Sequence, residues 1–228
     1  MAKRFSKEQL ETDALVTSYA RFVAFIQKNM AAVIMGAVVV LLLIAGGIWY
    51  YLQLQEREGQ AQELLVTAEQ MFENSNYESA LYGDDVTFEA GFAEIIQEYS
   101  RTDAANMARY YAAISAFRLD EHQEALTYIE DFDPPSGILG VGAISIHGAI
   151  LENLGEYQEA ARQYERAANW DRNSTTTPHN LLMAAQASLE ADNVQAAQNY
   201  LEEILDEYGD SRAADQALHI QGMLAAQN

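Results

Sequence analysis

The sequence predicts an all-α protein in which a single N-terminal transmembrane helix precedes an α-solenoid of about four helical hairpins with a C-terminal capping helix. Two observations carry this prediction. An uncharged and largely apolar run of 27 residues extends from Asn29 to Gln55. A helical pattern then recurs with a period of about 35 residues, and hairpins that bury their apolar stripes only against neighbours stack into solenoids.

The first 29 residues are predicted to be a cytoplasmic amphipathic segment, helical over about Lys7 to Gln27. All three lysines of the chain lie in residues 1–28, which carry a net charge of +2, whereas the chain after residue 51 carries −23. Basic residues flanking a span favour the cytoplasmic side of a membrane. The charge distribution therefore places the N-terminus in the cytoplasm and the acidic remainder on the other side.

Residues 30–51 are predicted to be the transmembrane helix. At about 1.5 Å per residue, some 20 apolar residues cover the roughly 30 Å hydrocarbon core of a bilayer. Trp49, Tyr50 and Tyr51 are expected at the membrane interface, where amphipathic rings are enriched. A cleaved secretory signal is the alternative, but the apolar stretch exceeds the roughly 7–15 residues of such signals. We predict a single-pass membrane protein with residues 52–228 as the exported domain.

Two segments of this domain, 113–132 and 148–167, align at an offset of 35 residues, with a third copy after them and a weaker one before. The equivalent alanines are Ala80, Ala125, Ala160 and Ala197. Gly148 suits a close approach of two helices, with Tyr164 in the seam. Gly155 suits a turn that needs positive φ, where the earlier copy has Asp120. A plain helical bundle is the alternative that the fixed period disfavours.

The helix of the span is expected to continue as far as Phe72. Further helices are expected near 86–99, 103–119, 122–132, 138–154, 157–169, 178–190, 194–207 and 211–226. The last of these has no partner hairpin after it, so we expect it to cap the solenoid.

The search for chemistry excludes most function classes. The chain has no cysteine, its four histidines are scattered, and it contains no phosphate-binding, dinucleotide-binding or hydrolase motif. We therefore predict no enzymatic activity, no cofactor, no metal and no small-molecule substrate. A net charge of −21 argues against nucleic acid as a partner. Asp84 and Asp85 are interpreted as solvated acids at a helix start.

What remains is a surface for binding proteins. Stacked hairpins present the exposed residues of their first helices along one face, which is the expected groove. In the repeat register these residues are Tyr110, Ile114, Phe117, Arg118, Ser145, Ala149, Glu152, Asn153, His179, Leu182 and Gln186. The acidic domain is expected to attract basic partners, most strongly at low salt.

The repeat pattern itself resembles a known one. Gly148, Leu151, Gly155, Tyr157, Ala160, Tyr164 and Ala167 resemble a tetratricopeptide repeat (TPR), best over residues 141–174 and also over 106–133 and 178–208. The whole organisation resembles the YfgM-like inner-membrane proteins, in the variant of Bacteroidetes-type relatives. That resemblance implies a single-pass protein of the bacterial inner membrane with residues 52–228 in the periplasm. It also implies an ancillary subunit of the SecYEG translocon that recruits a PpiD-like periplasmic chaperone or newly exported proteins.

Three alternatives stay open at this stage. The first is a TPR scaffold for another envelope process, such as envelope assembly, cell division or cytochrome maturation. The second is an enzyme with catalytic residues spread over several helices. The third is a stress regulator that acts through its cytoplasmic tail. The sequence does not separate the first alternative from the translocon role.

Overall fold

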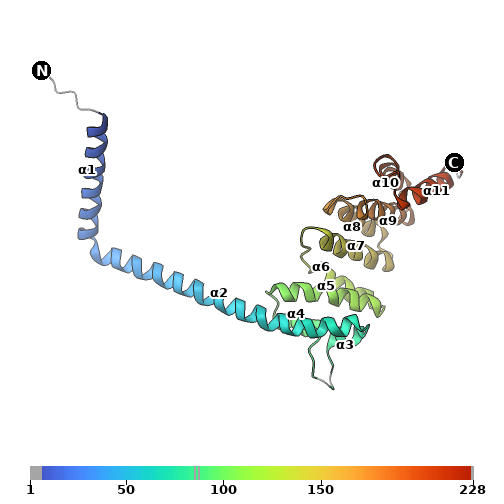
Figure 1. Ribbon diagram of the computed structural model, residues 1–228, viewed down its shortest axis with the longest axis horizontal. Helices are drawn as coiled ribbons and strands as arrows, with labels where there is room; N and C mark the ends of the chain where they lie inside the picture. The colour runs from blue at the N-terminus through green and yellow to red at the C-terminus, as the bar shows by residue number, and fades with distance from the viewer. Residues whose placement is uncertain (1–6, 85, 87, 227–228) are drawn as a thin grey trace. The chain divides into compact units, whose positions relative to one another are not determined.

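The computed structural model describes the backbone of residues 7–84, 86 and 88–226, and the side chains from Val16 onwards in these ranges except Ser18. Every regular element in this part of the chain is a helix, which confirms the predicted all-α class (Figure 1). The helices are α1 Lys7–Lys28, α2 Met30–Glu73, α3 Tyr77–Tyr82, α4 Phe92–Glu98, α5 Asp103–Arg118, α6 His122–Glu130, α7 Ile138–Asn153, α8 Tyr157–Trp170, α9 Thr176–Glu190, α10 Val194–Glu207 and α11 Arg212–Ala226.

The chain divides into two compact units, residues 1–56 and residues 57–228. The first contains α1 and the apolar part of α2. The second contains the end of α2 and all later helices. The predicted domain limits at residues 29 and 51 stay predictions.

Helix α2 contributes to both units, because it runs without interruption over 44 residues. It is long and apolar enough to cross a membrane, and none of the residues in its most apolar 18-residue window is buried. Trp49, Tyr50 and Tyr51 are all exposed. The predicted continuation of the span into a helix reaching Phe72 is confirmed.

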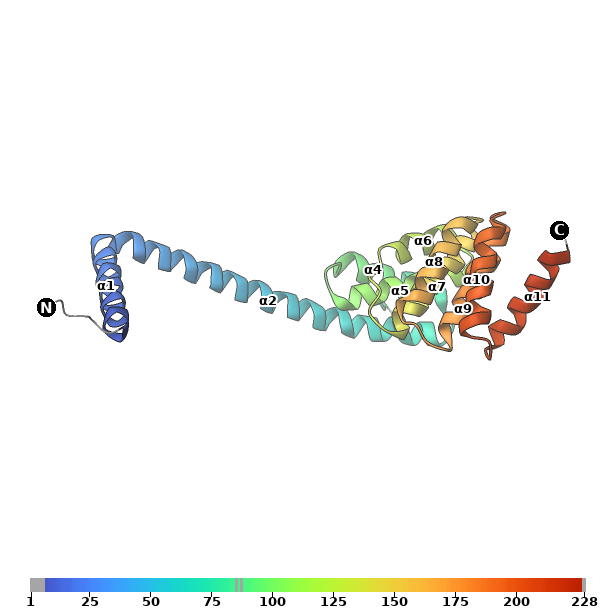
Figure 2. The same cartoon turned by 90° about the horizontal axis from the view of Figure 1, so that it is seen from above.

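The second unit contains four helical hairpins, α2–α3, α5–α6, α7–α8 and α9–α10 (Figures 1 and 2). Each turn contains one residue in the left-handed conformation: Ser75, Asp120, Gly155 and Asp192, with φ of 62°, 63°, 79° and 56°. The next N–H donates to a carbonyl five residues back, as in Glu156 to Leu151 at 2.9 Å and Asn193 to Ser188 at 2.8 Å. This is the Schellman closure of a helix, and it recurs in all four turns.

The internal repeat is equally regular in its packing. Ala80, Ala125, Ala160 and Ala197 have no exposed surface, and each lies three residues after the first residue of the second helix of its hairpin. A methyl group is the largest side chain that leaves room for such close helix packing. The predicted register of all four copies is therefore confirmed.

The predicted helix over 86–99 is wrong in its first part, because α4 begins only at Phe92. Between α3 and α4 the described residues form a loop closed by a hydrogen bond from Asp84 N to Glu89 O at 2.9 Å. A Cβ on Gly91 would lie 2.3 Å from the backbone nitrogen of Gly83, so the two ends of the loop meet as bare backbone.

The interpretation of Asp84 as a helix-start acid is therefore also wrong. Its Oδ1 instead accepts a hydrogen bond from Val86 N at 2.7 Å, inside the turn. Asp85 lies outside the described residues. Val86 and Phe88 expose 86% and 90% of their surface at the tip of this loop.

Helix α11 closes the C-terminal end of the described hairpins, as predicted. It packs against α9 and α10. Its buried residues Ala213, Ala214, Ala217 and Ile220 join a core cluster with Leu181, Leu201 and Ile204.

The close approach at Gly148 gives a matched pair of substitutions in α7. An alanine Cβ at Gly148 would lie 2.9 Å from two ring carbons of Tyr164, whereas one at Gly142 would meet only Tyr110 Oη, at 3.9 Å. Gly148→Ala is expected to lower the free energy of unfolding by about 1–3 kcal/mol through overpacking. Gly142→Ala is expected to raise it by about 0.5–1 kcal/mol, because alanine favours the helix. Urea denaturation in mild detergent measures both, and shifts of the same sign would contradict this packing.

Candidate protein-binding surface

The predicted groove residues on α5 are only partly available to a ligand. Tyr110 and Phe117 are half-buried, with ring centroids 5.5 Å from Phe132 and 5.3 Å from His122. These aromatic rings therefore fill the seam between α5 and α6. Ile114 is also half-buried, whereas Arg118, at the end of the helix, is exposed.

On α7 the predicted residues form a polar row of mixed exposure. Ser145 and Ala149 are half-buried and Asn153 is exposed, with its Nδ2 donating to the carbonyl of Ala149 at 2.9 Å. Glu152 accepts a hydrogen bond from Tyr164 Oη at 2.8 Å, so its carboxylate is engaged between α7 and α8. Only Asn153 presents a largely exposed side chain in this row.

A groove lies between α9 and α11 and has a volume of about 700 Å³. The predicted residues His179 and Leu182 both line it: His179 is exposed, and Leu182, with 2% of its surface exposed, is part of the floor. Gln186, one turn beyond Leu182, is half-buried and is not among the lining residues. The structure thus brings two of the predicted residues together in one hollow, and the others lie along the stack outside it.

Sequence reasoning missed the contribution of α11 to this groove. Its wall consists of Ser211, Arg212, Ala213 and Gln216. The sequence predicts only that α11 caps the stack. In the structure the start of α11 lies beside the start of α9, so α11 also lines the groove. The groove combines an apolar floor with hydroxyl, amide and guanidinium groups, which suits an extended peptide or a loop of a partner.

Several carboxylates of this acidic domain are engaged by tyrosines. The hydroxyl of Tyr82 lies 2.8 Å from both Glu121 and Glu124, and that of Tyr200 lies 2.9 Å from Glu165. Burial raises the pKa of each of these tyrosines, and the carboxylates raise it further. The pKa of Tyr128 is raised to about 12, by burial and by Glu124. The phenols therefore stay protonated at neutral pH, and Tyr82 and Tyr200 link neighbouring hairpins.

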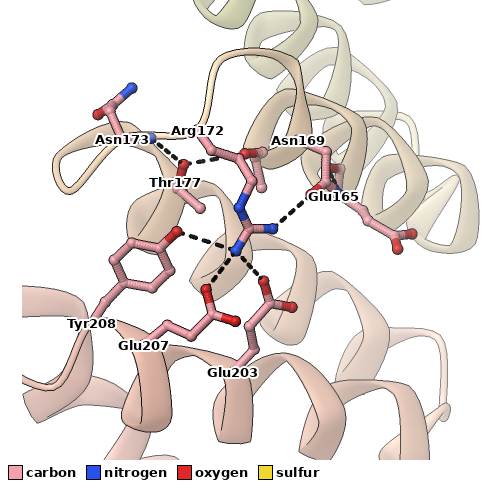
Figure 3. Close-up of polar contacts among 9 residues, drawn as sticks. Glu165, Asn169, Arg172, Asn173, Thr177, Glu203, Glu207 and Tyr208 are labelled. Carbon is pink, nitrogen blue, oxygen red and sulfur yellow. Dashed lines mark hydrogen bonds and ion pairs between the residues drawn. The ribbon is translucent and has the colours of Figure 1, made fainter.

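Arg172 makes the densest polar contact between hairpins (Figure 3). It lies between α8 and α9, and its Nη2 lies 2.8 Å from Glu203 and 2.9 Å from Glu207 of α10. The same nitrogen donates to Tyr208 Oη at 3.1 Å, and Nη1 donates to Asn169 at 2.8 Å. One guanidinium thus pairs with two carboxylates and ties the third hairpin to the fourth.

The start of α9 is fixed by the neighbouring Asn173. Its side-chain oxygen accepts from the backbone N–H groups of Thr175 and Thr176 at 2.9 and 2.8 Å. Its amide nitrogen donates to Asp171 and Thr176. These bonds position the first turn of α9 and hence His179 in the groove.

Comparison with known families supports this reading of the hairpins. Residues 179–211 match the tetratricopeptide repeat family. The chain carries a tetratricopeptide repeat. The match covers most of the α9–α10 hairpin, of which α9 lines the groove. It lies outside residues 141–174, where the sequence resembles the repeat most closely. No curated protein matches the sequence.

No group of three or more histidine, aspartate and glutamate side chains among the described residues is arranged to hold a metal ion. The absence of enzymatic activity, of a cofactor and of a small-molecule substrate stays a prediction. TPR domains generally mediate protein–protein interactions, and the groove is the candidate surface for that role.

Removal of the Arg172 guanidinium tests the link between the third and fourth hairpins. Arg172→Ala is expected to lower the free energy of unfolding by about 1 kcal/mol, because Glu203 and Glu207 then repel each other one helical turn apart. Arg162→Ala is the matched control, because its ion pair with Glu159 lies on the surface of a single helix. Arg162→Ala is expected to lower the free energy of unfolding by less than about 0.5 kcal/mol. Equal losses, or an Arg172 effect that persists unchanged at about 1 M salt, would contradict the ion-pair account.

His147 provides a pH-dependent test of the packing of α7. Burial, and the nearby charge of Arg166, lower the pKa of His147 below its ordinary value of 6.5. The unfolded chain therefore binds more protons as the pH falls below 6.5, and the folded state loses stability. His147→Gln is expected to reduce the drop in melting temperature between about pH 7.5 and 5.5. The control His179→Gln changes an exposed histidine, and an equal reduction there would refute a specific role for His147.

Proposed function

We propose that the protein is a membrane-tethered TPR scaffold that binds other proteins at the periplasmic face of the bacterial inner membrane. One observation carries the proposal: the same helix, α2, contains the apolar stretch and the first buried residues of the hairpin stack. Ala61, Leu65 and Ala68 of α2 lie in the core cluster that also includes α5. A chain built in this way has a membrane anchor and a protein-binding domain with little sequence between them.

The short separation supports a function at the membrane surface. Glu58, whose carboxylate accepts a bond from the start of α5, lies seven positions after Tyr51, the end of the proposed span. At about 1.5 Å per residue this is roughly 10 Å along the helix axis. Partners of the scaffold are therefore other membrane proteins or chains that emerge beside them, for which tethering raises the effective concentration.

Charge complementarity supports a basic partner. The chain after residue 51 has a net charge of −23. Such a field accelerates the encounter with positively charged surfaces and weakens as salt is added. In this proposal the acidic surface outside the groove attracts the basic partner. The groove between α9 and α11, whose lining includes no carboxylate, then binds an extended uncharged segment of that partner, with His179 and Arg212 as polar contacts.

The finer assignment rests on the resemblance to YfgM-like proteins. In this assignment the scaffold is an ancillary subunit of the Sec translocon that recruits a PpiD-like chaperone or newly exported proteins. The N-terminus is cytoplasmic, as the basic residues before the span and the acidic domain after it favour.

Site-specific photocrosslinking in cells tests the proposal. A photoreactive residue at His179 or Gln216, both lining the groove, is expected to capture a subunit of the translocon or a membrane-anchored chaperone. The matched control places the same residue at Gln195, an exposed position on α10 away from this groove. We expect at least a fivefold lower yield of the same adduct there.

The possible outcomes separate the two levels of the proposal. Capture of a different envelope complex from the groove positions would refute the translocon assignment and retain the scaffold. Equal yields from His179, Gln216 and Gln195 would refute the groove as the binding surface. Release of the protein from membranes by alkaline carbonate would refute the membrane tether.

A further inference from the structure

We propose that α1 lies in the plane of the membrane surface, as an interfacial helix bound to anionic lipids at the N-terminal end of the span. This inference rests on the proposed membrane anchor. It adds a second lipid contact, made by a helix that does not cross the bilayer. The relevant part of α1 is its second half, residues 16–28.

The first observation is the distribution of apolar side chains around the helix. Successive residues of a helix are rotated by roughly 100° about its axis, and six apolar residues of this segment fall within an arc of about 160°. They are Val16, Tyr19, Ala20, Phe22, Val23 and Ile26, and Gln27 lies in the same arc. Thr17, Arg21 and Lys28 fall on the opposite side, with Phe25 beside them. Most of the apolar surface thus lies on one side, as on a helix between an apolar and an aqueous medium.

The second observation is that the larger part of this arc is exposed in the protein itself, while Val23 and Ile26 are half-buried. Val16, Tyr19 and Phe22 expose 62%, 70% and 60% of their surface. Aromatic and branched side chains in such a continuous row mark an interaction surface. Tyr19 and Phe22 are also the types of residue that interfacial helices bury just below the headgroups.

The third observation identifies a bilayer as the occupant. The face is continuous with an apolar segment, because only Asn29 separates α1 from the start of α2 at Met30. At this junction the side-chain Nδ2 of Asn29 donates to the carbonyl of Phe25 at 3.0 Å. If α2 crosses the bilayer from Met30, residues 16–28 are held beside the membrane surface, and their insertion is effectively intramolecular.

Charge selects the lipid. From Val16 to Lys28 the chain carries two cations, Arg21 and Lys28, and no acid. With the apolar arc inserted, both side chains point toward the headgroup layer and water, where anionic headgroups attract them. An acidic protein surface is a poorer match, because it would leave the apolar arc without an apolar environment.

Single-cysteine labelling tests the inference, since the chain has no cysteine of its own. Nitroxide labels are introduced in the full chain at Tyr19→Cys and Val23→Cys on the apolar arc, and at Thr17→Cys on the polar side. Leu43→Cys reports on the span. Each variant is reconstituted in vesicles of phosphatidylcholine and phosphatidylglycerol, and collisions with oxygen and a water-soluble nickel chelate are measured.

We expect the labels at residues 19 and 23 to lie about 5–10 Å below the headgroups. Their exposure to the nickel chelate is expected to be at least fivefold lower than that of the label at residue 17. Vesicles of phosphatidylcholine alone are expected to give a smaller contrast, because the attraction of Arg21 and Lys28 is lost.

Three results would overturn the inference. Equal nickel exposure at residues 17, 19 and 23, with the label at residue 43 protected, would refute the interfacial helix while leaving the anchor intact. A water-exposed label at residue 43 would refute the anchor itself. Protection of residues 19 and 23 that disappears when the protein is diluted in lipid would show that a second copy of the chain, and not the bilayer, covers this face.

Discussion

The junction between the end of α2 and α5 is the constraint on which the rest of the structure depends. Both carboxylate oxygens of Glu58 accept hydrogen bonds from the start of α5, from Asp103 N at 2.7 Å and Ala104 N at 3.1 Å. A carboxylate at this position satisfies N–H groups that have no partner within the helix and complements the helix dipole. Thr102 completes the cap by accepting from Ala105 N at 3.0 Å. The first hairpin is thereby fixed to the second through the helix that contains the proposed membrane span.

The stack follows from that junction by repetition. A hairpin of two short helices has too small an interface to bury its apolar stripe, so each one requires a neighbour. Helix α2 provides the first buried face and α11 covers the last one. Between them the same closure of the turn and the same buried alanine recur four times. The tyrosine–glutamate bonds and Arg172 then add polar links at the edges of the apolar contacts.

Much of this arrangement could be predicted from the sequence, because it is encoded locally and repeated. The alanine that recurs in each hairpin and the glycine two residues before Tyr157 can be recognised in the sequence itself. Three or more copies of such a pattern at a fixed spacing are unlikely to occur by chance. The loop over 83–91 could not be predicted in this way. Its shape depends on the close approach of Gly83 and Gly91, whose backbones meet across seven intervening residues. Its acids and apolar residues also fit the start of a helix.

The candidate site was also hard to predict, because it too depends on contacts between segments that are distant in the sequence. The repeat register identified which residues lie on the first helices, but it could not distinguish residues that face solvent from residues that face another hairpin. Tyr110 and Phe117 pack in the seam of their own hairpin, and Glu152 accepts a bond from Tyr164. The groove depends on α11, which lies outside the repeated pattern. Longer-range pairs such as Arg172 with Glu207 occur at the repeat spacing of 35 residues. They become recognisable only once the hairpins are stacked.

The central claim is that one continuous helix both crosses the membrane and begins the hairpin stack. Hydrogen–deuterium exchange of the full chain in phospholipid nanodiscs tests it most directly. Continuous protection of backbone amides from Met30 to Glu73, including residues 52–60, is the result that this account predicts. Exchange of residues 52–60 at the rate of an unstructured peptide would contradict it, because the span and the stack would then be joined by a flexible linker.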